Sequence, residues 1–390
     1  MAYYRQPKFY RDFHCMGGSC PNSCCAIWRI DWTKEEVEKL KSAECSPELR
    51  QLIETSFIQR PDSETVMAIK TESENQFACP FLDSDRYCRI QRELGEEYLS
   101  YTCSSYPRTM FICNEIATRT CSASCYQVMK MICEDETSMQ LFSAPLESKY
   151  VEVKYAPDSA TEIQKHPELK YRNELFEFFY DIIGNTKRSL ETSVLLGALA
   201  AQKLTQYIQR GEADRIPEII KALRPQLNAT SVPSFENAKT NYGICLGLIG
   251  KLVDTFERSN VLDSLKINGK LSPELLEQGR AIINNYLKDK PHIMRNIALN
   301  FLLEGQVPLT NHEFSLFENY CYFASTIAAV KLICSAIAVQ DKAVINGLYI
   351  SVSFFVRGMY HKLLTIPQQV LDILKDNGCN SPAFIALMLK

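Results

Sequence analysis

Cysteine is distributed very unevenly along this chain, and this feature limits most strongly what the chain can fold into. Twelve of its 16 cysteines lie in the first 133 of 390 residues. The amino terminus carries charges and a proline where a secretory signal needs an uninterrupted apolar stretch. We therefore expect a cytoplasmic location. In that reducing compartment, clustered cysteines favour metal binding or catalysis over a framework of disulfides.

The rest of the composition is that of an ordinary soluble globular protein. Hydrophobic residues make up 46% and charged residues 23% of the chain, which excludes collagen-like and wholly disordered classes. A net charge of −3 gives no positive field, so we expect no nucleic acid as partner. The most apolar stretches, 322–339 and 343–356, are broken by Lys331 and separated by polar residues. We expect no transmembrane segment, and peripheral membrane association stays open.

Local signals predict a loop-rich first third with short helices. Residues 1–28 show little periodicity and predict a loop. A capping box predicts a helix over 33–43, and a Ser-Pro start predicts a second over 46–59. The stretch 66–69 predicts at most one short strand, and a further helix is expected from Arg89.

The second half of the chain shows apolar residues at three-to-four spacing, which predicts helix after helix. The predicted helices cover 174–183, 191–209, 213–223, 238–258, 273–287, 314–339 and 367–375. Since no strands alternate with them, the predicted fold class is mainly α, with a cysteine-rich metal-binding N-terminal region followed by an all-α helical body. The predicted domains are a metal-cluster domain over 1–133, a linker over 134–167 and a helical domain over 168–390.

The spacing of the early cysteines is typical of a loop wrapped around a metal. Four thiols fall within eleven residues, at Cys15, Cys20, Cys24 and Cys25, and two glycines between them add backbone freedom. Further candidates are Cys79, Cys88, Cys103, Cys121 and Cys125. Zinc and iron–sulfur clusters both take about four thiolates. Because the paired C-x2-C knuckles of zinc ribbons are absent, the spacing favours an iron–sulfur cluster, with zinc as the alternative.

The other cysteines are expected to be small buried apolar side chains rather than ligands. These are Cys45, Cys113, Cys133, Cys245, Cys321, Cys334 and Cys379.

Several separated motifs, taken together, resemble the flagellin lysine N-methylase family. In chain order they are Pro7 and Phe13, the Cys15 to Cys25 loop, Trp28 and Ile30, Cys79-Pro80-Phe81-Leu82 with Cys88, Leu94-Gly95, and the run from Thr102 to Arg108. A looser similarity covers 296–308. The resemblance therefore extends over most of the chain, and its specific motifs lie within residues 7–125.

The resemblance implies a function. A member of this family would be an S-adenosylmethionine-dependent enzyme with an oxygen-sensitive four-iron, four-sulfur cluster, and its partner would be flagellin, whose surface lysines it methylates in the bacterial cytosol. The cysteines that fall on family motifs are Cys15, Cys20, Cys24, Cys25, Cys79, Cys88, Cys103 and Cys125. Eight thiols exceed the need of one cluster, so a second metal site and a structural role for the surplus both stay open.

The site of the methyl donor has no sequence signature. No G-x-G-x-x-G follows a predicted strand, and the glycines at 243, 247 and 250 fit close helix packing better. The C-x3-C-x2-C loop of radical enzymes is also missing, because the second gap is reduced to nothing at the Cys24-Cys25 doublet. Radical and nucleophilic methyl transfer both remain open.

One segment combines acids, phenols and an arginine between two groups of cysteines. Within 94–108, Glu97 and Tyr101 are the candidates to orient and deprotonate a lysine amine, and Arg108 is the candidate to hold a carboxylate. We expect the active cleft between this segment, the 15–28 loop and the first helices of the body. The alternative function is a zinc- or iron-chelating protein without chemistry of its own, whose helical body binds a partner.

Overall fold

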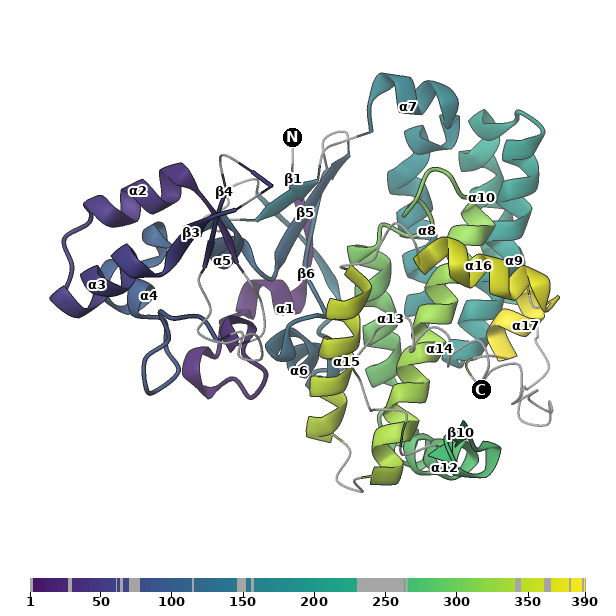
Figure 1. The fold of residues 1–390 in the computed structure, drawn as a ribbon. Helices are drawn as coiled ribbons and strands as arrows, with labels where there is room; N and C mark the ends of the chain where they lie inside the picture. Colours follow the sequence, from purple (N-terminus) through teal and green to yellow (C-terminus); the bar gives the residue numbers. More distant parts are fainter. Residues whose placement is uncertain are drawn as a thin grey trace.

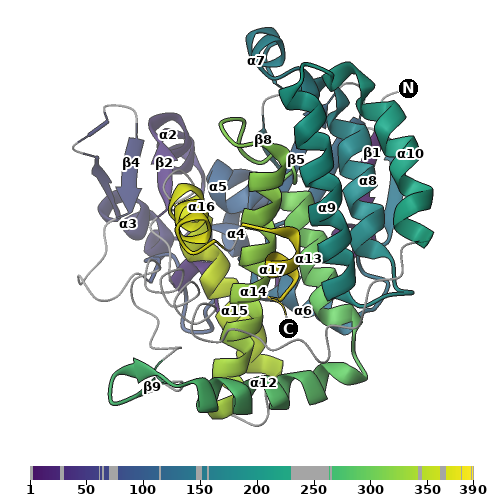
Figure 2. The same cartoon turned by 90° about the vertical axis from the view of Figure 1, so that its right-hand side faces the viewer.

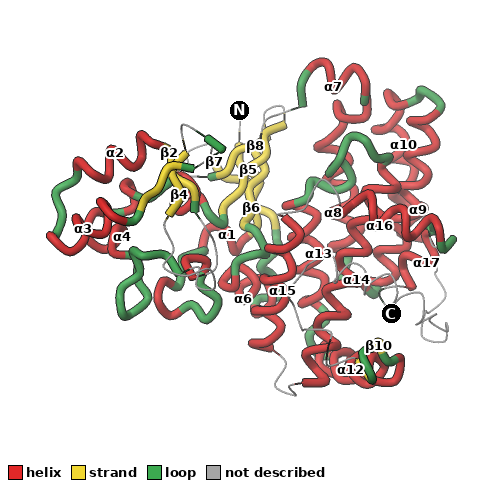
Figure 3. Tube along the Cα trace, viewed as in Figure 1, coloured by secondary structure: helices red, strands yellow, loops and turns green. Residues whose placement is uncertain are grey.

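The chain folds into a head of short strands and helices and a body of long helices (Figures 1 and 3). This architecture is taken from a computed structural model. The residues it describes are 3–26, 30–60, 62–63, 66–69, 78–113, 116–145, 152–155, 158–229, 263, 266–340, 345–360, 366–378, 380–387 and 389.

A five-stranded sheet in the order β7-β1-β6-β5-β8 lies at the centre of the head. Its strands are β1 (Tyr3–Pro7), β5 (Arg108–Cys113), β6 (Ile116–Cys121), β7 (Leu141–Pro145) and β8 (Val153–Tyr155). β5 and β6 form an antiparallel pair, whereas β1 runs parallel to β6 and β8 parallel to β5. Both outer strands thus come from 134–167, the range predicted as a linker, and the sheet is a feature that the sequence did not predict.

The sheet was missed for a physical reason. Five of the six residues of β6 are buried, so the strand does not show the alternation of a half-buried strand. β1 pairs with β6 and with β7, and both of these strands lie more than 100 residues after it in the chain. The pairing therefore depends on contacts that no local pattern reveals.

A smaller lobe of the head contains the helices predicted from their N-terminal signals. The three-stranded sheet β2-β4-β3 accompanies four short helices. These elements are β2 (Asp31–Thr33), β3 (Phe57–Gln59), β4 (Val66–Ile69), α2 (Lys34–Ser42), α3 (Pro47–Thr55), α4 (Arg89–Leu94) and α5 (Tyr101–Ser105). The capping box is confirmed, because the Thr33 N–H donates to Glu36 Oε2 at 2.8 Å and the Glu36 N–H donates to Thr33 Oγ1 at 3.2 Å. The second helix is shorter than predicted, since 57–59 is strand.

This lobe has its own small apolar core, which we call the head core. It consists of Ile30, Trp32, Val37, Leu40, Leu49, Ile53, Phe81 and Ile90. The main core is much larger. It begins at Phe9 and Tyr10 in α1 (Lys8–Asp12), includes α6 (Tyr126–Glu134), and continues through the body helices.

The body confirms the prediction of a mainly helical second half within the described residues. Its helices are α7 (Ala160–Lys165), α8 (Arg172–Gly184), α9 (Leu190–Gln209), α10 (Ile216–Ala229), α12 (Pro273–Lys288), α13 (His292–Glu304), α14 (Leu316–Gln340), α15 (Ile345–Tyr360), α16 (Ile366–Asp376) and α17 (Pro382–Leu387). Two-residue strands, β9 (Lys266–Ile267) and β10 (Lys270–Leu271), precede α12. The helix predicted over 238–258, with its glycine series, lies outside the described residues.

Helix α14 is the central helix of the body. It is long and apolar enough to cross a membrane, but 94% of its apolar window is buried inside the protein. It contacts α9, α12, α13, α15, α16 and α17, and Figure 2 shows α12 lying across one end of it. Its Lys331 is buried and donates to the Leu389 carbonyl at 2.6 Å. These contacts are those of a core helix in a folded body.

The head and the body share an interface built on α6. Both α13 and α15 pack against this helix (Figure 1). Asn296 of α13 donates to the carbonyls of Ile132 and Asp135 at 2.9 and 3.1 Å, and Asn300 donates to the Cys121 carbonyl at 3.2 Å. The cysteine-rich region is therefore held directly by the helical body.

Candidate functional site

The first cysteine loop is shaped by close contact with the turn between Cys79 and Cys88. Gly17 has φ +56°, and a Cβ atom there would lie 2.5 Å from the Tyr87 ring. A Cβ atom on Gly18 would lie 2.2 Å from the Asp85 carbonyl oxygen. Since only glycine permits both this backbone conformation and this approach, the loop and the turn fold against one another.

That turn is closed by a short hairpin. Leu82 and Cys88 form an isolated antiparallel bridge, and the Asp83 carboxylate accepts the N–H groups of Asp85 and Tyr87 at 2.9 Å each. The hydrogen bond from Tyr87 is the main cause that lowers the pKa of Asp83. These hydrogen bonds fix the turn between Leu82 and Cys88.

An arginine from the C-terminal third of the chain holds the cysteine loop from the other side. Arg357 of α15 is only 4% exposed. Its Nε donates to the Ser124 carbonyl at 2.8 Å, and its two terminal nitrogens donate to Oδ1 and the carbonyl of Asn22 at 3.1 and 3.0 Å. Asn22 in turn donates to Ser353 Oγ at 2.9 Å. One guanidinium thus joins the loop that precedes Cys24 to the turn that precedes Cys125, a contact that local sequence patterns did not predict.

The thiols differ in how easily they ionise. The hydrogen bond from the Cys24 side chain is the largest of the effects that lower the pKa of Cys25 to about 7. Burial raises the pKa of Cys103 and that of Cys125 to about 12, and it raises the pKa of Cys79 further. These buried thiols stay neutral at neutral pH unless a cation compensates the charge of the thiolate.

Thiols are the donors that a thiophilic metal prefers. The eight motif cysteines are free thiols, and a bound cation would supply the charge that the buried thiolates need. Within the described residues, no three His, Cys, Asp or Glu side chains are arranged to hold a single metal ion. Both the iron–sulfur cluster and the zinc alternative therefore stay predictions.

The three predicted catalytic residues make different contacts. Glu97 is exposed and its carboxylate folds over Gly95, within 2.5 Å of where a Cβ atom would stand. The Tyr101 hydroxyl donates to the Glu152 carbonyl at 2.8 Å. Arg108 begins β5, and its guanidinium lies 5.2 Å from the centre of the Phe13 ring. Their catalytic roles stay predictions, and Trp28 of the predicted cleft lies outside the described residues.

A buried acid is a feature that the sequence interpretation missed. Glu152 is 2% exposed, and its Oε1 lies 2.9 Å from Nε of the buried Arg119 and accepts the Tyr10 hydroxyl. Burial, then the contact with Glu152, raises the pKa of Tyr10. Arg119 also donates to Gln6 Oε1 at 3.0 Å. Glu152 lies in a stretch without periodicity, so the pairing with a strand residue 33 positions earlier gave no local signal.

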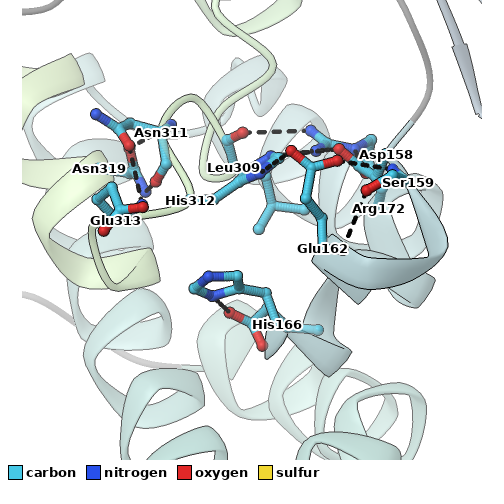
Figure 4. A network of polar contacts seen from close by, with 11 residues as sticks. Asp158, Ser159, Glu162, His166, Arg172, Leu309, Asn311, His312, Glu313 and Asn319 are labelled. Carbon is cyan, nitrogen blue, oxygen red and sulfur yellow. Dashed lines mark hydrogen bonds and ion pairs between the residues drawn. The ribbon is translucent and has the colours of Figure 1, made fainter. Parts of the chain in front are cut away.

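A second polar network joins α7, α8 and the loop after α13 (Figure 4). Arg172 pairs with both oxygens of Asp158 at 2.8 and 2.9 Å, and His312 Nε2 lies 3.2 Å from the same carboxylate. The rings of His166 and His312 lie 6.0 Å apart. In the sequence these histidines are scattered. The network connects the start of α8 to Asp158, before α7, and to the loop after α13.

Comparison with known proteins shows to which family the chain is similar. Residues 176–388, more than half of the chain, match the FliB lysine N-methylase C-terminal domain. A stretch of 136 residues, 35% of this chain, is 30% identical to the flagellar biosynthetic protein FliU of Salmonella muenchen and covers 80% of that protein. Matches of the same length and identity to lysine-N-methylases of Salmonella choleraesuis and Salmonella typhimurium cover 34% of each. No solved structure matches.

The matches describe a class of protein whose helical C-terminal part is shared with lysine N-methylases. The chain belongs to the FliB lysine N-methylase family. The resemblance predicted from the sequence motifs is thereby confirmed. The family match covers the helical body, whereas the specific motifs lie in residues 7–125. The matched stretch spans about a third of the length of the two curated lysine-N-methylases.

Proposed function

We propose that this protein is a cytoplasmic methyltransferase that transfers a methyl group from S-adenosylmethionine to lysine side chains on the surface of flagellin. The match of residues 176–388 to the lysine N-methylase domain carries the proposal. The names of the relatives, a flagellar biosynthetic protein and two lysine-N-methylases, support both the reaction and a flagellar substrate.

The proposal includes an iron–sulfur cluster held by cysteines of the head. The free, mostly half-buried thiols of this region support it, since their chemistry suits a soft metal. When bound, such a cluster supplies either electron transfer or an open iron that chelates the amino and carboxylate groups of the donor. The chain's own residues must still bind the lysine and remove its proton.

In the nucleophilic route, proton removal is the step that the protein must provide. Only the neutral amine attacks, because its lone pair forms the new N–C bond while the C–S bond of the sulfonium breaks and the thioether leaves. Glu97 is the candidate to orient the lysine ammonium, since its carboxylate is exposed on the surface of η3 (Glu96–Tyr98). The proton then passes to this carboxylate, and Arg108 pairs with a carboxylate of the donor.

The test is a methylation assay under anaerobic conditions. Purified protein, flagellin and methyl-labelled S-adenosylmethionine are incubated together, and peptides are analysed for methyl-lysine by mass spectrometry. We expect label on flagellin lysines. Protein with a full metal content that neither binds the donor nor labels flagellin would support the non-enzymatic metal-binding alternative instead.

The candidate residues are tested one at a time. We expect Glu97→Gln, Tyr101→Phe and Arg108→Lys to leave the iron content unchanged. Loss of the proton acceptor should lower the rate about 100-fold, the lower end of what general acid–base groups contribute. Parental rates in all three variants, with iron retained, would place the active cleft elsewhere.

A further inference from the structure

The polar network of Figure 4 contains a histidine that faces charged groups with both of its ring nitrogens. This residue is His312, in the loop after α13. Its Nε2 lies 3.2 Å from Asp158 Oδ1 and 3.2 Å from Nη2 of Arg172. Its Nδ1 lies 3.8 Å from Glu162 Oε1. The number of protons on this ring therefore decides which of these neighbours it can bind.

The charged neighbours of this histidine are held in place by contacts of their own. Arg172 is buried, pairs with both oxygens of Asp158 at 2.8 and 2.9 Å, and lies 4.7 Å from the ring centre of Phe111 in β5. Glu162 belongs to the capping box of α7, in which its Oε2 accepts the Ser159 N–H at 2.7 Å. Its other oxygen faces the imidazole. The charges around the ring are thus preorganised.

An uncharged imidazole and an imidazolium hold different neighbours. An uncharged ring with a bare Nε2 accepts a hydrogen bond from Arg172 and cannot donate to Asp158. A protonated ring carries an N–H on both nitrogens. It therefore donates to Asp158 and attracts Glu162 at the same time, and both contacts gain from the added charge. Both carboxylates belong to the segment that begins α7, so the proton ties this segment to the loop after α13.

Three further charged or titratable groups stand beside the ring. Arg172 opposes an added charge, but its own charge is offset by the bidentate pair with Asp158. His166, whose ring centre lies 6.0 Å away, also opposes it when protonated. Glu168, in η4 (Pro167–Tyr171), lies 3.7 Å from Nδ1 of His166 and offsets that charge. Among the described groups, three carboxylates thus lie within 4 Å of the two imidazoles, against one guanidinium.

The titration of Glu162 supports this balance of charges. Hydrogen bonds from Ser159 are the main cause that lowers the pKa of Glu162, and the charges of His312 and His166 lower it further. Since the attraction between two charges is mutual, the carboxylate of Glu162 favours a proton on the imidazole that faces it.

We propose that His312 is a pH-sensitive clasp, which holds the start of α7 on the body more tightly when its imidazole is protonated. Asp158 lies three positions after β8, the outer strand that pairs with β5. β5 begins at Arg108, a candidate catalytic residue. The proton on His312 therefore acts on the edge of the sheet that carries this candidate. The clasp goes beyond the proposed function and does not depend on whether the protein methylates lysine.

The first test follows the proton itself. Full-length protein with isotope-labelled histidine is titrated by NMR between about pH 5 and 8, the range in which histidine changes its charge, and the signal missing from His312→Gln assigns His312. In Glu162→Gln the pH at which His312 titrates should fall, because a carboxylate that favours the imidazolium is gone. His292, whose Nε2 lies 3.0 Å from the Cys133 carbonyl, is the internal control and should titrate as before. An unchanged titration of His312 would overturn the proposal.

The second test measures how tightly the clasp holds. Urea denaturation compares the parent protein with His312→Gln at about pH 6 and about pH 8, on either side of the usual titration of histidine. The parent should have the higher urea midpoint at the lower pH, and this difference should shrink at the higher pH, where the imidazolium has lost its proton. Groups that the two proteins share titrate alike in both, so their effects cancel in the difference.

A second variant keeps this test informative if His312→Gln does not fold, which far-UV circular dichroism shows. Glu162→Gln removes only a partner of the imidazolium and should show the same pH-dependent loss of midpoint. A difference from the parent that is equal at both pH values would contradict the clasp. Because methylation is not measured, neither result bears on the proposed methyltransferase activity.

Discussion

At the scale of single residues, two buried arginines connect parts of the chain that are distant in sequence. Arg357 and Arg119 are each buried and each join segments that are distant in the chain. Guanidinium groups suit this role because they present several donors in a fixed plane. The sequence predicted the eight motif cysteines through their resemblance, but it did not predict the contact of Arg357 with Asn22 and Ser124. Arg357 lies more than 200 positions beyond Cys125.

The contact made by Arg357 gives the first prediction. Arg357→Gln should lower the free energy of unfolding by about 3 kcal/mol, since hydrogen bonds to a buried charged group are each worth about 1.5–3 kcal/mol and their acceptors lose their partner. Urea denaturation measures the change. Arg210→Gln, an exposed arginine at the end of α9, is the matched control and should leave the free energy of unfolding unchanged.

Glu152 and Arg119 give the second prediction. Glu152→Gln leaves the Arg119 charge buried without its counter-ion, which should cost about 3–5 kcal/mol of stability. Arg119→Met should cost a similar amount, and the double variant should cost less than the two single effects together, because it leaves no lone charge. Chemical denaturation of all four proteins measures the coupling. Strictly additive effects would show that the two groups do not stabilise one another.

At the scale of elements, the sequence predicted helices of two kinds: α12, which has one polar face, and α14, whose residues 319–338 are all buried. α12 shows a clear apolar stripe and begins at a Ser-Pro signal, and its start at Pro273 matches the prediction. α13 was missed although His292, Asn296 and Asn300 recur at four-residue spacing, and all eleven residues from Ile293 to Leu303 are buried. The strands of the head sheet were missed because their partners lie far away in the chain.

The contact between α12 and α14 gives the third prediction. A Cβ atom on Gly279 of α12 would lie 2.3 Å from the Ser335 carbonyl oxygen of α14. Since a backbone oxygen cannot move aside, Gly279→Ala should destabilise the protein by about 1–3 kcal/mol, the usual cost of overpacking. Gln278→Ala, the exposed neighbour on the same helix, removes no contact of this kind. A lower melting temperature for both variants alike would contradict the close approach.

At the scale of the whole molecule, the main core and the head core predict two levels of stability. The main core runs from α1 through α6 into the body, so these helices should unfold together. The head core is small and lies in a separate lobe. Cys79, Cys88 and Cys103 pack against it. Its stability should therefore depend on the metal that the proposed function assigns to the cysteines of the head, because thiolate metal sites contribute on the order of 10 kcal/mol to folding in small domains.

Removal of the metal therefore gives the fourth prediction. After anaerobic treatment with a chelator, amide hydrogens of α2 and α3 should exchange much faster, since their buried side chains Leu40 and Leu49 belong to the head core. Amides of α9 and α14 should keep their protection, because those helices are buried in the main core. Hydrogen exchange with mass spectrometry measures both regions in one sample. Equal loss of protection in α2 and α14 would show that the metal stabilises the whole protein as one unit, and unchanged protection in α2 would show that the head core is stable without a metal.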